Sequence, residues 1–167
     1  GDVYKRQVRL RGEEKPLIQV DTPEALVALA QSGVLEIHPW GARGARLAQP
    51  DRMVLDLDPA EDLSFDSVVA AALALRERVL ALGLAPFCKT TGGKGLHLVV
   101  PLAPGARWDR LHAVAAAICE DLAREAPQRF TTQSALAGRD GRIFLDFQRN
   151  ARGASAVAPW SCLLYTS

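Results

Sequence analysis

The chain has 167 residues, of which 49% are hydrophobic and 23% are charged, shares typical of a globular protein with room for one domain. Its net charge of +1 argues against a protein that binds nucleic acid with its whole surface, but a local basic patch is compatible with it. No apolar run reaches membrane-spanning length, and no signal-peptide pattern is present. The three cysteines lack metal-ligand spacing, which predicts a reduced, cytoplasmic protein.

Both ends of the chain have sequences that fit no predicted element. Residues 1–7 and 162–167 resemble translated adapter sequence from a clone library, so we expect them to be non-native. We expect residues 8–161 to form a catalytic core that is a fragment of a larger domain.

Apolar periodicity and turn residues predict six short strands and three helices. Alternating or continuous apolar runs indicate the strands, and wider apolar stripes indicate the helices. In chain order, the predicted elements are a strand over 17–20, a helix between 23 and 33, a strand over 34–38, a loop over 41–49, a strand over 53–58, a helix over 65–82, strands over 86–90 and 96–101, a helix over 108–126, a turn over 137–141 and a strand over 142–147.

Capping residues and helix breakers set the ends of the helices. Asp21 or Thr22 is expected to cap the first helix and Ser64 or Asp62 the second, while Pro127 ends the third. Strands interleaved with helices predict an α+β (mixed α/β) fold. The short connection between the fourth and fifth strands predicts a hairpin, so at least part of the sheet is antiparallel.

Three carboxylates lie in apolar, strand-like runs, where an ionised group is costly to bury without a partner. Asp56 and Asp58 are two residues apart, so on a strand they share a face, about 7 Å apart. Such a pair can bridge two divalent cations, and Asp146 at the end of another strand is the natural third ligand. The alternative is that Asp56 and Asp58 cap the next helix or end their strand in solvent.

A glycine-rich loop over 91–95 offers consecutive backbone N–H groups that can approach a phosphate. It is not a Walker A loop, because that spacing is absent and a strand follows it. The alternatives are a plain hairpin turn with a solvated lysine, and a histidine with a structural role. The candidate phosphate-binding residues are Lys89, Thr91, Gly92, Gly93, Lys94 and His97.

Two further groups are candidates for the same site. His38 lies at a predicted strand end beside Trp40, where it is either a ligand or a structural histidine. Arginines crowd around the third carboxylate in the sequence, and they either cradle a phosphate or form surface ion pairs. These are Arg139, Arg142, Arg149 and Arg152.

In combination, these motifs resemble archaeo-eukaryotic-type primase-polymerases. More closely, they resemble the polymerase domain of the bacterial end-joining DNA ligases of the ligase D type. The resemblance covers nearly all of residues 16–161. It is carried by Asp-Leu-Asp at 56–58, Thr-Gly-Gly-Lys-Gly-Leu-His at 91–97, Phe-Leu-Asp-Phe at 144–147, and the segments 36–40 and 149–161.

The resemblance implies a largely antiparallel catalytic sheet flanked by helices. It implies that Asp56, Asp58 and Asp146 ligate two Mn²⁺ or Mg²⁺ ions. Thr91 stands where the family usually has serine, so the hydroxyl group is kept. The residues that the resemblance places around the NTP or dNTP substrate are His38, Thr91, Lys94, His97 and Arg139.

The activity implied is template-directed nucleotidyl transfer, which adds (ribo)nucleotides at DNA ends during non-homologous end joining. The implied partners are DNA, nucleoside triphosphates, the ligase domain and Ku, in a bacterial cytoplasm at the nucleoid. Members of the family also have an N-terminal region that binds the DNA end, and an arginine where this sequence has Leu163. Both differences leave open whether this fragment is itself active.

Two other functions compete with this interpretation. A haloacid-dehalogenase-like phosphatase also uses an Asp-x-Asp pair, but it calls for Thr or Val where this sequence has Ala60, and it leaves the glycine loop unexplained. The other alternative is a catalytically silent fragment that only binds nucleic acid.

Overall fold

The computed structural model describes residues 6–8, 16–44, 46–135 and 139–161. Most of the two ends expected to be non-native, including Leu163, lie outside the described residues, as do the first two residues of the turn predicted over 137–141. The chain divides into two compact units, Gly1–Ile37 and His38–Ser167, and each is described by itself.

The first unit contains a short hairpin and one helix. Strand β1 (Arg6–Val8) pairs antiparallel with β2 (Leu17–Gln19). Helix α1 (Pro23–Gln31) begins after Thr22, whose side chain accepts a hydrogen bond from the Ala25 amide at 3.2 Å. Thr22 rather than Asp21 is therefore the cap.

The strand predicted over 34–38 is wrong. These residues belong to no helix or strand, and no strand of the described chain pairs with them. Val34 and Leu35 are 36% and 51% exposed, so the alternating pattern is not matched by a buried face. A segment with alternating apolar residues forms a strand only where a neighbouring strand can pair with it and a core can bury its apolar face.

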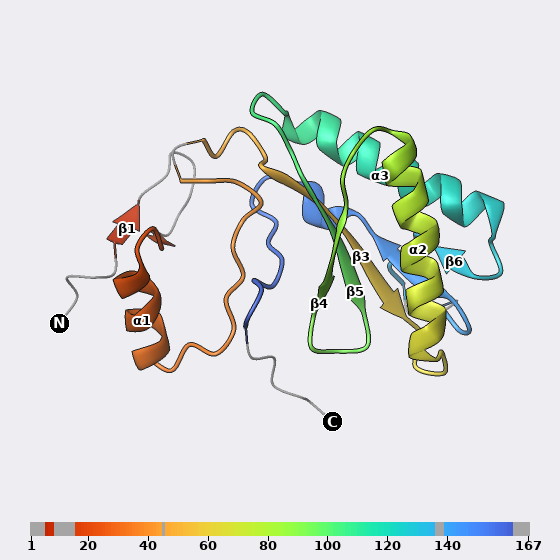
Figure 1. The fold of residues 1–167 in the computed structure, drawn as a ribbon, viewed down its shortest axis with the longest axis horizontal. Helices are drawn as coiled ribbons and strands as arrows, with labels where there is room; N and C mark the ends of the chain where they lie inside the picture. The colour runs from red at the N-terminus through yellow and green to blue at the C-terminus, as the bar shows by residue number, and fades with distance from the viewer. Residues whose placement is uncertain (1–5, 9–15, 45, 136–138, 162–167) are drawn as a thin grey trace. The chain divides into compact units, whose positions relative to one another are not determined.

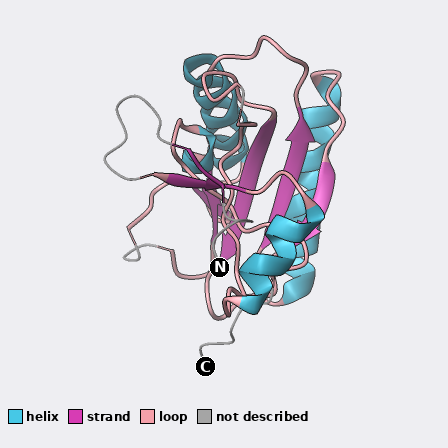
Figure 2. Ribbon diagram, turned by 90° about the vertical axis from the view of Figure 1, so that its left-hand side faces the viewer, coloured by secondary structure: helices cyan, strands magenta, loops and turns pink. Residues whose placement is uncertain are grey.

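The second unit is built on a five-stranded sheet with the order β4-β5-β3-β7-β6, shown in magenta in Figure 2. All neighbouring strands are antiparallel except β6 and β7, which confirms the largely antiparallel sheet and the hairpin between β4 and β5. Its members are β3 (Arg52–Pro59), β4 (Phe87–Thr90), β5 (Leu96–Pro101), β6 (Phe130–Thr131) and β7 (Ile143–Asp146).

Two helices cover one face of this sheet, α2 (Phe65–Ala81) and α3 (Trp108–Glu125), as Figure 1 shows. The side chain of Ser64 caps α2 by accepting from the Ser67 amide at 3.4 Å. Both helices match their predicted ranges to within a residue. None of the helices in the described part of the chain is long and apolar enough to cross a membrane.

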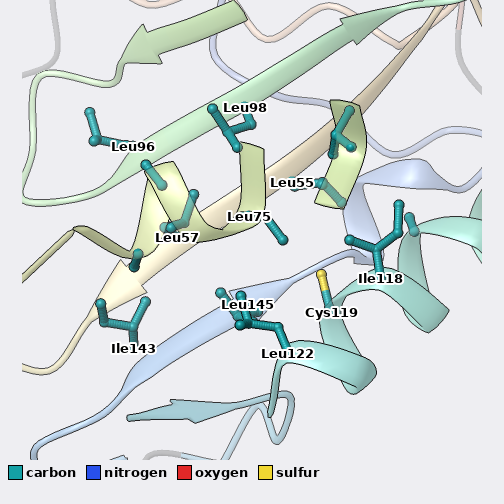
Figure 3. Close-up of a cluster of buried hydrophobic side chains, with 14 of the residues drawn as sticks. Leu55, Leu57, Leu75, Leu96, Leu98, Ile118, Cys119, Leu122, Ile143 and Leu145 are labelled. Carbon is teal, nitrogen blue, oxygen red and sulfur yellow. The ribbon is translucent and has the colours of Figure 1, made fainter. Parts of the chain in front are cut away.

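The core lies between the helices and the sheet. Leu55 and Leu57 of β3 are fully buried there against Leu75 of α2, and Leu145 of β7 joins them (Figure 3). Side chains alternate along a strand, so the residues between these leucines point to the other face of the sheet. Asp56 is one of them, and the core therefore fixes the face on which it lies.

Candidate active site

A row of polar side chains crosses the sheet on the face opposite the helices. Lys89 of β4 lies opposite His97 of β5, His97 lies opposite Asp56 of β3, and Asp56 lies opposite Asp146 of β7. Residues directly opposite each other in antiparallel strands project from the same face, at neighbouring positions. Four residues from four strands are therefore brought into one line.

Asp56 is the centre of this row and is only 3% exposed. Its Oδ2 atom lies 3.2 Å from Nε2 of His97, which is 4% exposed, and 3.1 Å from Nη2 of Arg149. A buried carboxylate is tolerated where it is paired and hydrogen-bonded, and Asp56 meets both conditions. Nδ1 of His97 is buried, and it has no hydrogen-bond partner among the described residues.

Asp146 ends β7 and begins a turn that returns to Asp56. Its Oδ1 atom accepts a hydrogen bond from the Gln148 amide at 2.7 Å, and the 3-10 helix η1 (Gln148–Asn150) follows. Arg149 of this helix lies with Nε 3.8 Å from Oδ2 of Asp146 and 3.2 Å from Oδ2 of Asp56. One guanidinium group thus lies between the two carboxylates.

Asp58 completes the predicted trio on the same face of β3. Its pKa is raised to about 6, first by burial and then by the negative charges of Asp56 and Asp146, and the nearby Arg149 and Arg139 offset part of this rise. The positive charge around the trio is therefore insufficient to hold Asp58 at the ordinary pKa of an aspartate.

The chemistry of these residues suits a hard divalent cation, because Mg²⁺ and Mn²⁺ prefer carboxylate oxygens. The elevated pKa of Asp58 agrees with this, since a bound cation would reverse the repulsion that causes it. The geometry is not that of a closed metal site: no group of three His, Cys, Asp or Glu side chains within the described residues is placed to hold an ion. Arg149 and His97 occupy Oδ2 of Asp56 instead.

The glycine loop between β4 and β5 lies beside the carboxylates. The Thr91 hydroxyl donates to the carbonyl of Gly95 at 3.2 Å, and Gly92 has φ +86°, which favours glycine. The backbone at Gly95 passes so close to β3 that an added Cβ would lie 3.4 Å from Oδ1 of Asp58. Gly92, Gly93 and Lys94 are exposed.

Lys89 points toward a small cavity of about 60 Å³ beside the row. Its Nζ donates to the carbonyl of Val157, and burial lowers its pKa although Asp56 lies near it. Arg52 and Arg149 also line this cavity, so three cations surround it. A larger hollow of about 380 Å³ lies along α2 and the start of β7, and none of the predicted site residues lines it.

Two chain segments border this cavity. Trp40 forms a β-bridge with Ser155, and the Ala156 amide donates to the carbonyl of Pro39 at 3.4 Å. Pro39 and Ala156 both line the cavity. His38 directly precedes this bridged segment and is exposed, so the structure places it near the cavity but not in its lining.

Arg139 packs on Phe144 of β7, beside the trio. Its guanidinium lies 4.0 Å from the centroid of the Phe144 ring, and it donates to the carbonyl of Ser134. Phe144 lies opposite Asp58 in the β3–β7 register, so Arg139 lies on the side of the sheet where Asp58 is found. Of the four clustered arginines, Arg149 contacts Asp56 and Asp146, and Arg139 lies near enough to Asp58 to lower its pKa.

Sequence reasoning did not rank Arg149 above its neighbours, although it makes the closest contacts with Asp56. The available signal was the spacing of three residues between Asp146 and Arg149, which places both on one side of a helical turn. No helical turn was predicted there.

The residues 2–163 match the model of the LigD primase-polymerase domain. The chain belongs to this family. It is 46% identical over 146 residues to the multifunctional non-homologous end joining protein LigD of Pseudomonas aeruginosa, a match that covers 87% of this chain and 17% of that protein. It is 31% identical over 144 residues to the LigD of Mycolicibacterium smegmatis, covering 85% of this chain and 19% of that protein.

A solved structure of the same family has a similar fold. The polymerase domain of Mycobacterium tuberculosis ligase D in complex with DNA superposes with a TM-score of 0.84 at 27% identity, over 94% of this chain and 57% of that one. The family and the mixed α/β fold inferred from the motifs are thus confirmed, and the phosphatase alternative is set aside. The chain spans about a fifth of the length of the curated relatives it matches.

Proposed function

We propose that this chain is the catalytic core of a template-directed nucleotidyltransferase that adds nucleotides at DNA ends during non-homologous end joining. The observation that carries the proposal is the row of Lys89, His97, Asp56 and Asp146, in which cationic and anionic groups share one face of the sheet. Family membership supports it, and so does the DNA named with the similar polymerase domain.

The proposed role of the trio is to hold divalent cations, Mn²⁺ or Mg²⁺. Asp56, Asp58 and Asp146 offer the oxygen ligands, and two ions bound there would activate the attacking 3′-hydroxyl and neutralise the departing pyrophosphate. An ion held by Oδ2 of Asp56 would replace the contact of this atom with Arg149, at 3.1 Å. The Arg149 guanidinium would then be available to the incoming phosphates.

The cations of the row and the loop would bind the triphosphate. Lys89 and Arg149 line the same cavity, and Arg149 has a half-exposed side chain that presents a planar fork suited to phosphate oxygens. His97 presents a buried Nδ1 with no hydrogen-bond partner within the described chain, which a phosphate oxygen would satisfy when the ring is protonated. Thr91, Lys94 and the glycine amides would add to this site from the hairpin, whose Gly95 lies beside Asp58.

The remaining partners are proposed from the relatives. LigD proteins are named for non-homologous end joining, and we propose DNA ends as the substrate, with a ligase domain and Ku acting in the same repair system. We propose a bacterial cytoplasmic location at the nucleoid on the same grounds.

Binding and extension assays on this chain test the proposal. We expect Mn²⁺-dependent binding of a nucleoside triphosphate, and extension of a primer opposite a template. Asp56→Asn and Asp146→Asn should each abolish both the binding and the extension. The matched control is Asp109→Asn, because Asp109 is an exposed acid of α3 that pairs with Arg107 away from the trio. Nucleotide and metal binding that is unchanged in both site variants would refute the proposal. DNA binding without any metal or nucleotide binding would favour the silent fragment.

A further inference from the structure

Strand β3 extends beyond the point at which its neighbour β7 stops. The pairing of β3 with β7 ends at Asp56 opposite Asp146, whereas β3 itself begins four residues earlier, at Arg52. Val54 lies in the part of β3 that β7 does not pair with, and it is only 5% exposed. Its backbone amide and carbonyl point to the side of β3 on which β7 lies further along the strand. Buried backbone groups without partners are costly.

The side chain of Asn150 takes the place of the missing strand. The Val54 amide donates to Oδ1 of Asn150 at 2.8 Å, and Nδ2 of Asn150 donates to the Val54 carbonyl at 2.7 Å. These are the two bonds that a paired strand residue would make with Val54. Asn150 is 1% exposed, so neither bond is shared with solvent.

A second set of bonds ties the same residue to the turn after β7. Nδ2 of Asn150 donates to the Phe147 carbonyl at 2.8 Å, and the Asn150 amide donates to that carbonyl at 3.1 Å. One side chain therefore joins the middle of β3 to the first residue after β7. It closes the turn that contains η1.

The turn decides where Arg149 lies. If β7 continued straight, Arg149 would be three residues beyond Asp146, about 10 Å further along the strand and on the opposite face of the sheet, because strand side chains alternate. In the turn, Arg149 instead lies on the catalytic face, with Nη2 3.1 Å from Oδ2 of Asp56. The contact between Arg149 and Asp56 depends on β7 ending at Asp146.

We infer that Asn150 is a positioning residue, whose carboxamide replaces β7 as the partner of Val54 and thereby holds Arg149 against Asp56. An asparagine suits this place because it combines one acceptor with two donors on a short side chain. Aspartate keeps the acceptor but loses both donors. The functional consequence, although not the geometry, rests on the proposed nucleotide-binding role of Arg149.

The first measurement needs no ligand. In Asn150→Ala, we expect hydrogen exchange at the Val54 amide and at the Arg149 Nε–H group, followed by NMR, to accelerate at least tenfold. Amides in the distant α2–α3 core should keep their protection. Asn150→Asp, which keeps the acceptor for the Val54 amide, should accelerate the exchange of Arg149 Nε–H while sparing Val54. If the alanine variant does not fold, the aspartate variant alone tests the inference. An Arg149 Nε–H group that stays protected in either folded variant overturns the inference.

The second measurement is a double-mutant cycle on nucleotide affinity. We expect Asn150→Asp and Arg149→Ala each to weaken Mn²⁺-dependent triphosphate binding about tenfold, and the combined variant to lose no more than Arg149→Ala alone. Val79→Ala, which weakens the core near the C-terminal end of α2, should leave affinity unchanged and so controls for stability. Full additivity in the cycle would overturn the inference. If the wild-type chain binds no nucleotide, the proposed function fails for this chain, and the exchange experiment still decides the positioning role.

Discussion

An added Cβ atom at Gly95 would lie 2.5 Å from the backbone carbonyl oxygen of Leu57. That distance is shorter than any tolerated contact, and the obstructing atom is backbone in the central strand, which cannot rotate away as a side chain can. The glycine is thus required by the close approach of the hairpin to β3. The same approach sets the glycine loop against Asp58.

Gly95→Ala is expected to destabilise the fold by about 1–3 kcal/mol, the usual cost of overpacking, and to displace the loop from Asp58. Gly93→Ala is the matched control in the same loop. Gly93 is exposed, and its added Cβ would meet only the Thr91 hydroxyl, at 3.9 Å. Urea unfolding of both variants measures the difference. Equal stability of the two would show that the hairpin shifts freely.

The metal-free protein should show a pH-dependent contribution from Asp58. Its pKa is about 6 in the folded chain and near the ordinary 3.8 when unfolded, so the folded state binds the proton more tightly. The stabilisation is fully present below about pH 4 and is lost as the pH rises through 6. Asp58→Asn should therefore be more stable than the wild type at pH 7, by about 1–2 kcal/mol, with the difference shrinking toward pH 4.

Unfolding in the presence of a chelator, at several pH values, measures this difference. Asp109→Asn is the contrasting control, because the hydrogen bond from Arg107 lowers the pKa of this exposed acid and its pH dependence should have the opposite sign. An Asp58→Asn variant that is less stable than the wild type at neutral pH would contradict the prediction.

Removal of the Arg149 side chain should have opposite effects on two ligands. The guanidinium pairs with Asp56 at 3.1 Å and lowers the pKa of Asp58, so it competes with a divalent cation for the carboxylates. Arg149→Ala should bind Mn²⁺ alone several-fold more tightly, and should bind the Mn²⁺ triphosphate about tenfold more weakly. Titrations followed by the Mn²⁺ spin-resonance signal separate the two. Arg149→Lys keeps the positive charge but loses the planar fork of the guanidinium. Its affinities for both ligands should therefore lie between those of the wild type and of Arg149→Ala.

Much of the site followed from local sequence pattern. Strand alternation placed Asp56 and Asp58 on one face, and the structure confirms this because the intervening Leu57 is buried in the core. That Asp146 lies opposite Asp56 could not be derived in the same way, because the register joins strands far apart in sequence. The place of Asp146 at the end of an apolar strand made it a candidate third ligand, and the family resemblance pointed to the same residue, but neither gave its register with Asp56.

The parts that sequence reasoning missed depend on distant contacts. Arg149 reaches Asp56 only because Asn150 bonds to Val54, 96 residues away, and ends strand β7 there. The spacing of three residues between Asp146 and Arg149 fits a helical turn, but nothing local in the sequence shows that a turn forms there. The strand predicted over 34–38 failed for the converse reason, since its alternation is a local signal and the described chain provides no strand to pair with it.

The stability of the second unit should depend on the layer between α2 and the sheet. Leu75 is fully buried against Leu55 and Leu57, whereas Leu73 on the same helix is 54% exposed. Leu75→Ala should lower the free energy of unfolding by about 2–5 kcal/mol, because it leaves a cavity in packed surroundings. Leu73→Ala should change it by less than about 0.5 kcal/mol, since alanine also suits a helix. Urea unfolding compares the pair, and similar losses in both variants would mean that the exposed face of α2 is covered in solution.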